Sequence, residues 1–230
     1  MKKRCTKTIF TVCLAAMMLS GCSEIDENAS IDVSAPITTE SVTEAAAEAA
    51  TEEAQENTSD EVVYFYQKDE AWASSSLGDS IYTMGDSGCV TCCVAAVLQM
   101  QHITIDGLAS DADAGEVNQF FSENGGYDSE GNMLWDTLEE RTGQTVVRKD
   151  ASELGTSELY VLLDTLLEEG IYPILRVKVD GNGAYHYVVL VSSENGTYSC
   201  MDPLHSTEEL VPLSDFGDAI YAIRYIQTSA

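Results

Sequence analysis

Basic residues are scarce in this chain of 230 residues. It contains 11 Lys and Arg against 39 Asp and Glu, so its formal net charge at pH 7 is −28. This balance argues against a nucleic-acid partner, because neutralising phosphates requires clustered Lys and Arg. The same charge repels anionic lipid headgroups and favours basic peptides as partners. The length leaves room for one domain with a substantial core.

Histidine and cysteine, the usual ligands of zinc, are also few. The chain has three His and seven Cys, and Cys89 and Cys92 have the spacing of a zinc or redox pair. No second Cys pair or His cluster completes a four-ligand site. The residues beside this pair do not match those of thiol–disulfide exchange proteins, so redox chemistry is a minor alternative. We expect no metal and no other cofactor.

Residues 23 to 60 lack Lys, Arg and every aromatic residue, while 11 of them are acidic. Such a segment cannot bury enough apolar surface to fold. We therefore expect residues 22–60 to form a disordered acidic tether that self-repulsion extends. At Glu61 the composition changes, because Val62 to Tyr66 is a β-branched and aromatic run typical of a strand. We place the folded domain at residues 61–230.

The first residues have the pattern of an export signal. Lys2, Lys3, Arg4 and Lys7 precede an apolar run from Ile9 to Leu19, which is shorter than the ~20 residues of a membrane-spanning helix. Its ending, Leu19-Ser20-Gly21-Cys22, resembles the lipobox of bacterial lipoproteins. The alternative is an ordinary signal peptide that happens to end in Cys.

The lipobox resemblance implies a signal peptide over residues 1–21 and a diacylglycerol group on the thiol of Cys22. The protein would then be held on the bacterial cell surface, at the outer face of the cytoplasmic membrane, by its lipid. Removing the signal takes four basic residues and no acidic ones, which leaves seven basic against 39 acidic residues and a formal charge of −32.

Hydrophobic patterns predict helices first and strands afterwards. Residues 88–100 are apolar nearly all round, which indicates a buried central helix, and further helices are expected at 114–123, 133–141 and 156–169. After Gly170, strands are expected at 171–179, 185–192, 197–201 and 219–226. Gly-rich and Asn-rich turns at 180–183 and 194–196 favour antiparallel hairpins. These elements predict an α+β domain.

Three residues on these elements have a spacing that suits nucleophilic chemistry. Cys89 stands at the start of the buried helix, where free N–H groups and the helix dipole favour a thiolate. His186 opens a predicted strand, from which it can act as a base for a nearby thiol. Asp202 ends the next strand, and antiparallel pairing can bring its carboxylate to the imidazole and orient it.

Four motifs in order resemble a known family. They are Gln67 followed by Trp72, Gly88-Cys89 opening an apolar helix, His186 followed by an apolar strand, and Met201-Asp202-Pro203. Together they resemble the papain-like cysteine peptidases of the double-glycine, bacteriocin-processing type, and most of all their stand-alone secreted peptidase-like relatives. The resemblance spans about residues 64 to 226.

This resemblance implies a papain-like fold, with a helical N-terminal half whose buried nucleophile helix packs on a C-terminal antiparallel sheet. It implies Cys89 as nucleophile, His186 as general base, Asp202 as the group that orients it, and Gln67 as side-chain donor to the oxyanion. The backbone N–H of Cys89 would be the second donor. The implied activity is hydrolysis, or transfer, of a peptide amide in a peptide or protein substrate.

The chain departs from the family at the nucleophile. Family members usually continue Cys-Gly-Pro-Thr, whereas this sequence reads Cys89-Val90-Thr91-Cys92-Cys93. In the broader papain signature the second Cys of a Cys-x-x-Cys pair is the nucleophile, which would select Cys92. We favour Cys89, because the apolar residues 95–98 then fall where the double-glycine type places them. A catalytically inactive peptide-binding or adhesion module with the same fold is the alternative function.

The remaining Cys and His residues have structural interpretations. Cys92 and Cys93 lie on the buried helix and are expected to be small core residues. Cys200 is expected either in the core or in a disulfide with one of them. His102 follows the helix, where a cation suits the dipole. His205 lies in a loop after Asp202 and is the chemical rival of His186.

Overall fold

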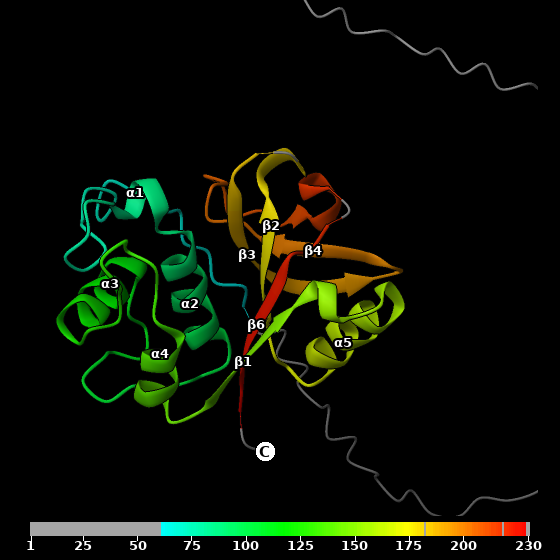
Figure 1. Ribbon diagram of the computed structural model, residues 1–230, viewed down its shortest axis with the longest axis horizontal. Coiled ribbons are helices and arrows are strands. Elements are labelled where there is room, and N and C mark those ends of the chain that lie inside the picture. The colour runs from blue at the N-terminus through cyan, green and yellow to red at the C-terminus, as the bar shows by residue number, and fades with distance from the viewer. Residues whose placement is uncertain (1–60, 182, 218, 229–230) are drawn as a thin grey trace, which may run out of the picture. The chain divides into compact units, whose positions relative to one another are not determined.

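An antiparallel β-sheet is the centre of the part of the chain that the computed structural model describes, which is residues 61–181, 183–217 and 219–228. Six strands lie in the order β1-β6-β2-β3-β4-β5, and every neighbouring pair is antiparallel (Figure 1). The strands are β1 (Thr145–Asp150), β2 (Ile174–Lys178), β3 (Tyr185–Glu194), β4 (Thr197–Met201), β5 (Val211–Pro212) and β6 (Ala222–Gln227).

Helices α1 to α4 lie together on one side of the sheet, and α5 lies apart from them (Figure 1). They are α1 (Met84–Ser87), α2 (Cys89–Met100), α3 (Ala114–Glu123), α4 (Trp135–Thr142) and α5 (Thr156–Glu168). Three short 3-10 turns lie between other elements: η1 (Ala151–Glu153) follows β1, η2 (Val179–Gly181) follows β2, and η3 (Leu213–Phe216) follows β5.

Two apolar cores form because alternate strand residues point to opposite faces of the sheet. On one face, Ile174, Val189 and Ile226 pack in a cluster with the buried side of α2. On the other face, Leu175 and Val188 pack in a second cluster with the leucines of α5. The sheet is therefore covered on both faces, and the prediction of an α+β domain with a central buried helix and an antiparallel sheet is confirmed.

Most predicted elements are present with small changes at their ends. Helix α4 begins at Trp135, two residues later than expected, because Met133 forms a β-bridge with Tyr127. Strand β2 begins at Ile174, three residues later than expected, because Pro173 has no N–H to give to a ladder. Both ends of α3 and β4 agree with the prediction, and α2 begins one residue later than expected, at Cys89.

Two expectations about the strands are wrong. The strand expected at residues 62–66 is irregular chain, and its apolar side chains pack against the α2 core without joining the sheet. The helices do not all precede the strands, because β1 comes before α5. Strand β1 escaped prediction because Arg148, Lys149 and Asp150 break its apolar pattern.

The signal, Cys22 and tether predicted over residues 1–60 lie outside the described residues and stay predictions, as does the boundary at Glu61. Within the described residues, no helix combines the length and the apolar character that crossing a membrane requires.

Candidate active site

Cys89 is the first residue of α2, and a close packing contact fixes its position. Helix α1 ends at Ser87, and Gly88 alone separates it from α2. A Cβ on Gly88 would lie 2.5 Å from the carbonyl oxygen of Met84, so only glycine allows the two helices to meet this closely. Residues 91–98 of α2 are buried, whereas Cys89 and Val90 are half-buried and line a cleft.

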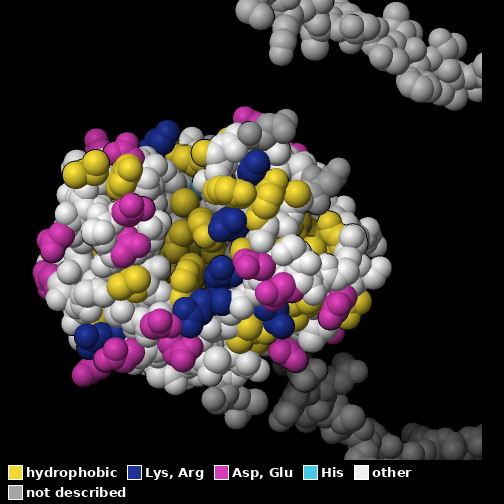
Figure 2. Space-filling view, viewed as in Figure 1, with side chains coloured by type: hydrophobic (Ala, Val, Ile, Leu, Met, Phe, Trp, Pro, Cys, Tyr) yellow, Lys and Arg dark blue, Asp and Glu magenta, His cyan; other side chains and the backbone are white. Residues whose placement is uncertain are grey.

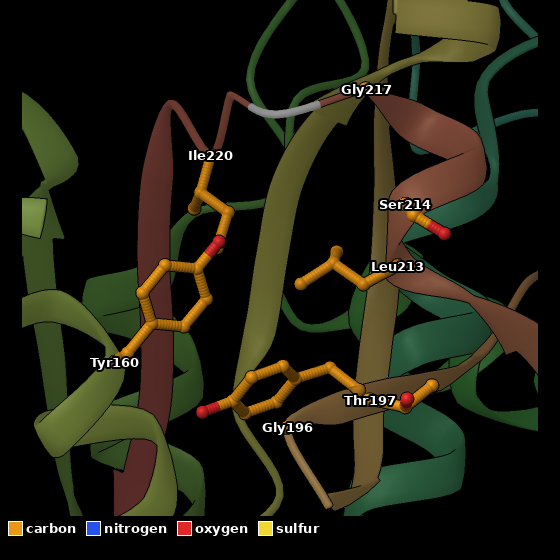
Figure 3. Close-up of a pocket in the computed structure, with 8 residues that line it drawn as sticks. Tyr160, Gly196, Thr197, Leu213, Ser214, Gly217 and Ile220 are labelled. Carbon is orange, nitrogen blue, oxygen red and sulfur yellow. The ribbon is translucent and has the colours of Figure 1, made fainter. Parts of the chain in front are cut away.

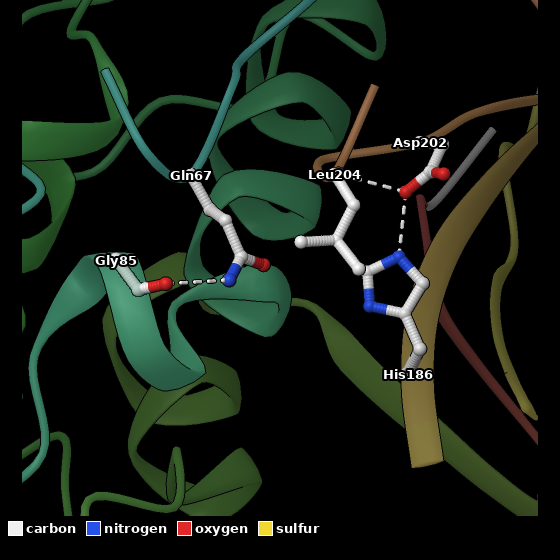
Figure 4. Close-up of polar contacts among 5 residues, drawn as sticks. All are labelled: Gln67, Gly85, His186, Asp202 and Leu204. Atoms are coloured by element: carbon white, nitrogen blue, oxygen red, sulfur yellow. Dashed lines mark hydrogen bonds and ion pairs between the residues drawn. The ribbon is translucent and has the colours of Figure 1, made fainter. Parts of the chain in front are cut away.

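His186 and Asp202 form a buried pair at the end of the sheet. The imidazole Nε2 lies 2.6 Å from Oδ1 of Asp202, and the His186 side chain is 3% exposed (Figure 4). The same carboxylate oxygen accepts the N–H of Leu204 at 2.8 Å. The imidazole is therefore held by a carboxylate that the backbone itself fixes in place.

A β-bulge sets the register of the hairpin that leads to this pair. Near the turn, β3 and β4 pair Glu194 with Thr197, but the register shifts by one between Leu190 and Ser192, so that Val189 pairs with Met201. Met201 is the last residue of β4, and Asp202 follows it directly. The bulge therefore fixes the point at which the chain leaves the sheet for Asp202.

The environment of His186 favours its protonated form. Burial opposes the charge, but the hydrogen bonds with Asp202 and Cys89 and the negative charges of these two groups outweigh it, and the pKa of His186 is raised to about 9. Cys89 is thus close enough to interact with the imidazole. Because Nε2–H donates its hydrogen bond to Asp202, Nδ1 is the ring nitrogen that can interact with the thiol.

Gln67 connects the two sides of the site. Its backbone N–H donates to the carbonyl of Pro203, next to Asp202, at 2.9 Å. Its side-chain Nε2 donates to the carbonyl of Gly85 in α1 at 3.0 Å (Figure 4), and its buried Oε1 has no hydrogen-bond partner among the residues that the structure describes. Gln67 is 3% exposed, so its amide is held in place beside the start of α2.

Trp72, the other residue of the first motif, has a structural role. Its indole Nε1 donates to the carbonyl of Tyr66 at 3.0 Å, and its ring meets Phe65 edge to face. It therefore anchors the segment that carries Gln67 onto the core.

A cleft of about 490 Å³ opens over Cys89. One wall comes from α2 and the turn around Glu130, and the other comes from Arg176 and Tyr185 of the sheet. Glu130, Arg176 and Tyr185 were not predicted as site residues, because they lie far from Cys89 along the chain. Thr91, which marks the departure from the family pattern, is buried and shares a hydrogen bond of 2.8 Å with the hydroxyl of Tyr127.

The other cysteines of the described residues lie in the core. Cys92, Cys93 and Cys200 are free and fully buried, and burial raises the pKa of each thiol far above its ordinary value. The prediction that these three lie in the core is confirmed. The alternative, a disulfide between Cys200 and Cys92 or Cys93, is not formed. A buried neutral thiol is a poor nucleophile, so the geometry favours Cys89 over Cys92.

The other two histidines place their imidazoles elsewhere, although the backbone N–H of His205 donates to the carbonyl of Asp202 at 2.9 Å. His102 follows α2 in the left-handed region, with φ 52°. His205 is partly exposed, and its Nδ1 lies 3.0 Å from the hydroxyl of Thr207. Among the described residues, no three His, Cys, Asp or Glu side chains are placed to hold a metal ion.

A second cavity of about 440 Å³ lies between α5 and the sheet. Figure 3 shows Tyr160 of α5 on one side of it and Leu213 of η3 on the other. Tyr198 also lines it, and its hydroxyl donates to Asp164 at 2.8 Å. Its lining contains no thiol and no imidazole, so it offers no nucleophile and base together.

Comparisons with known proteins found no match to the sequence and a distant match to the structure. No family model matches the sequence, and neither does any curated protein. A matching solved structure from Bacillus anthracis is described as a C39-like peptidase; it shares 16% sequence identity, and the match covers 74% of this chain and 96% of that chain with a TM-score of 0.46. A likeness this distant assigns neither a family nor an activity.

Proposed function

We propose that this protein is a papain-like thiol peptidase of the double-glycine type, or a related acyl transferase. The observation that carries the proposal is the buried His186–Asp202 pair, joined at 2.6 Å, next to the half-buried thiol of Cys89 in an open cleft. A nucleophile, a base and a group that orients the base are the parts that nucleophilic amide cleavage needs.

The first half of the reaction forms an acyl-enzyme. His186 takes the thiol proton on Nδ1, and the Cys89 sulfur attacks the carbonyl carbon of a peptide bond. The resulting oxyanion lies near the start of α2, where the Cys89 N–H and the second hydrogen of the Gln67 amide are the candidate donors. His186 then gives its proton to the amide nitrogen, the C–N bond breaks, and the amine leaves.

The second half restores the thiol. His186 takes a proton from a water molecule, the resulting oxygen attacks the thioester carbonyl, and the C–S bond breaks. The sulfur recovers a proton from His186, and a carboxylic acid is released. If an amine takes the place of water, the product is a new amide. Throughout, Asp202 holds the imidazole in one tautomer and stabilises its charge.

One observation favours a second function, a module that binds peptides without cutting them. The Gln67 amide already donates to Gly85, and its unpartnered atom is the acceptor Oε1. With the amide in this orientation, only one N–H of Gln67 is free for an oxyanion. Peptide binding in the cleft would need neither this donor nor the thiol.

Alkylation separates these functions. We expect iodoacetamide to label Cys89 selectively at pH 6, at least about tenfold faster than in His186→Ala, because a protonated His186 stabilises a neighbouring thiolate. The modified residue is mapped by peptide mass spectrometry in wild type, Cys89→Ala and His186→Ala. A labelling rate that rises only near pH ~8.5, with or without His186, would instead indicate an inactive binding module.

We also propose that the domain is carried outside the cytoplasm, at the outer face of the cytoplasmic membrane, by a lipid on Cys22. The support is the sequence Leu19-Ser20-Gly21-Cys22 after an export signal. Cys22→Ser is expected to abolish incorporation of radiolabelled palmitate in a bacterial host, while Cys5→Ser leaves it unchanged. Palmitate incorporation that survives Cys22→Ser would refute the anchor.

A further inference from the structure

Basic residues are concentrated on one part of the sheet. Residues 61–230 contain seven Lys and Arg, and five of these lie on the adjacent strands β1, β6 and β2: Arg148, Lys149, Arg176, Lys178 and Arg224. Figure 2 shows Lys and Arg side chains in a band along the hollow between the helices and the sheet. A chain with a net charge of −28 thus gathers most of its remaining positive charge at one place.

Four of these residues share one face of the sheet. Arg148 pairs directly with Arg224 across β1 and β6, and Arg176 pairs with Ala222 across β6 and β2. Because strand residues alternate, Arg148, Arg224, Arg176 and Lys178 lie on the same face as the residues that pack against α2. Like charges directly opposite one another, such as Arg148 and Arg224, destabilise a sheet.

Carboxylates of the described chain leave most of this band unneutralised. Asp136 contacts Arg148 at 2.6 Å, and no other described carboxylate oxygen lies within 4.0 Å of these basic groups. One guanidinium nitrogen of Arg224 donates to the carbonyls of Lys149 and Ile223. Arg176 and Lys178 have no such partner among the described residues.

Arg176 is the member of the band that lines the Cys89 cleft. Its guanidinium lies 4.3 Å from the centre of the Tyr185 ring, and its buried Nε has no hydrogen-bond partner within the described part of the chain. Tyr185, itself packed against Tyr221, also lines the cleft. The ring holds the guanidinium in place while its N–H donors remain available, which suits recognition of a planar anion.

We propose that the cleft selects peptides with a carboxylate that binds Arg176. This inference rests on the proposed function only in taking the Cys89 cleft as the peptide site. It reverses the preference for basic peptides that the overall charge suggests, because charges beyond about 10 Å are largely screened at physiological salt while a contact with Arg176 is not. Glu130 on the opposite wall repels the same carboxylate, so the anion is directed to the sheet side.

The carboxylate has two sources in a peptide, an acidic side chain or the C-terminus. The test measures binding of fluorescent peptides to the full-length Cys89→Ala protein in detergent, so that no hydrolysis is needed. Matched peptides differ only in Glu, Gln or Lys at one position, and each is made with a free and an amidated C-terminus. If amidated peptides bind more weakly than free ones, the C-terminal carboxylate is the source. If Glu peptides still bind better than Gln peptides after amidation, the side-chain carboxylate is the source.

We expect a peptide with the carboxylate to bind with a Kd about tenfold lower than the matched peptide with an amide in its place, as for a charge-assisted hydrogen bond. Arg176→Met should remove this preference, and Arg176→Glu should replace it with a preference for Lys. Arg176→Lys retains the charge if the Met variant does not fold. Arg141→Met, an equal charge change on the exposed end of α4, is the control.

A preference that survives Arg176→Met, or that Arg141→Met removes equally, would overturn the inference. So would peptides that bind without regard to the carboxylate, or that do not bind. None of these outcomes bears on thiol chemistry, because the alkylation of Cys89 and its dependence on His186 are measured without any peptide.

Discussion

Cys89→Ala is expected to lower the rate of peptide-bond hydrolysis by about 10³-fold or more, whereas Cys92→Ala changes it by less than about threefold. The two residues are one helical turn apart and lose the same atom. Cys89 lies in the cleft beside His186, and Cys92 is fully buried with a raised pKa. Only the first substitution removes a sulfur that can attack a carbonyl.

Peptide cleavage is measured by mass spectrometry on a peptide library, and acyl-enzyme by the intact mass of acid-quenched protein. A covalent adduct should appear in wild type and in Cys92→Ala and be absent from Cys89→Ala. Loss of activity in Cys92→Ala alone would favour the register of the broader papain signature. A wild-type protein that binds peptides and forms no adduct would favour the binding module.

The sequence was most informative where a local pattern decides the structure. Helix α2 was predictable because it is apolar nearly all round and therefore has to be buried. The hairpin of β3 and β4 was predictable because Asn195 and Gly196 favour a tight turn, and both residues have positive φ. The proximity of His186 and Asp202 follows from this hairpin.

The details that complete the site depend on contacts that the sequence does not display. The bulge between Leu190 and Ser192 sets the register in which β4 leads to Asp202, and no Gly or Pro marks it. The run at Val62 to Tyr66 has strand composition, but its side chains are used in the α2 core. The basic band needs β6 between β1 and β2, an order that no local pattern specifies.

Asp202→Ala is expected to lower the free energy of unfolding at pH 6 by about 3 to 5 kcal/mol, the usual cost of leaving a buried charge without its partner. The His186 imidazole would stay buried beside the apolar ring of Phe216, and the N–H of Leu204 would lose its acceptor. Urea unfolding measures the loss, and Asp202→Asn, which keeps the shape and an acceptor oxygen, should lose less.

The pH dependence of stability tests the charge on His186. Its pKa is raised from 6.5 to about 9 on folding, so the protonated imidazole stabilises the native state. That contribution is fully present below pH 6.5 and is lost as pH rises through about 9; the pKa difference corresponds to about 3 kcal/mol. The difference in the free energy of unfolding between wild type and His186→Gln should therefore shrink over this range. In His205→Gln, the pH dependence of wild-type stability should persist. A constant difference would mean that folded His186 is neutral over this range.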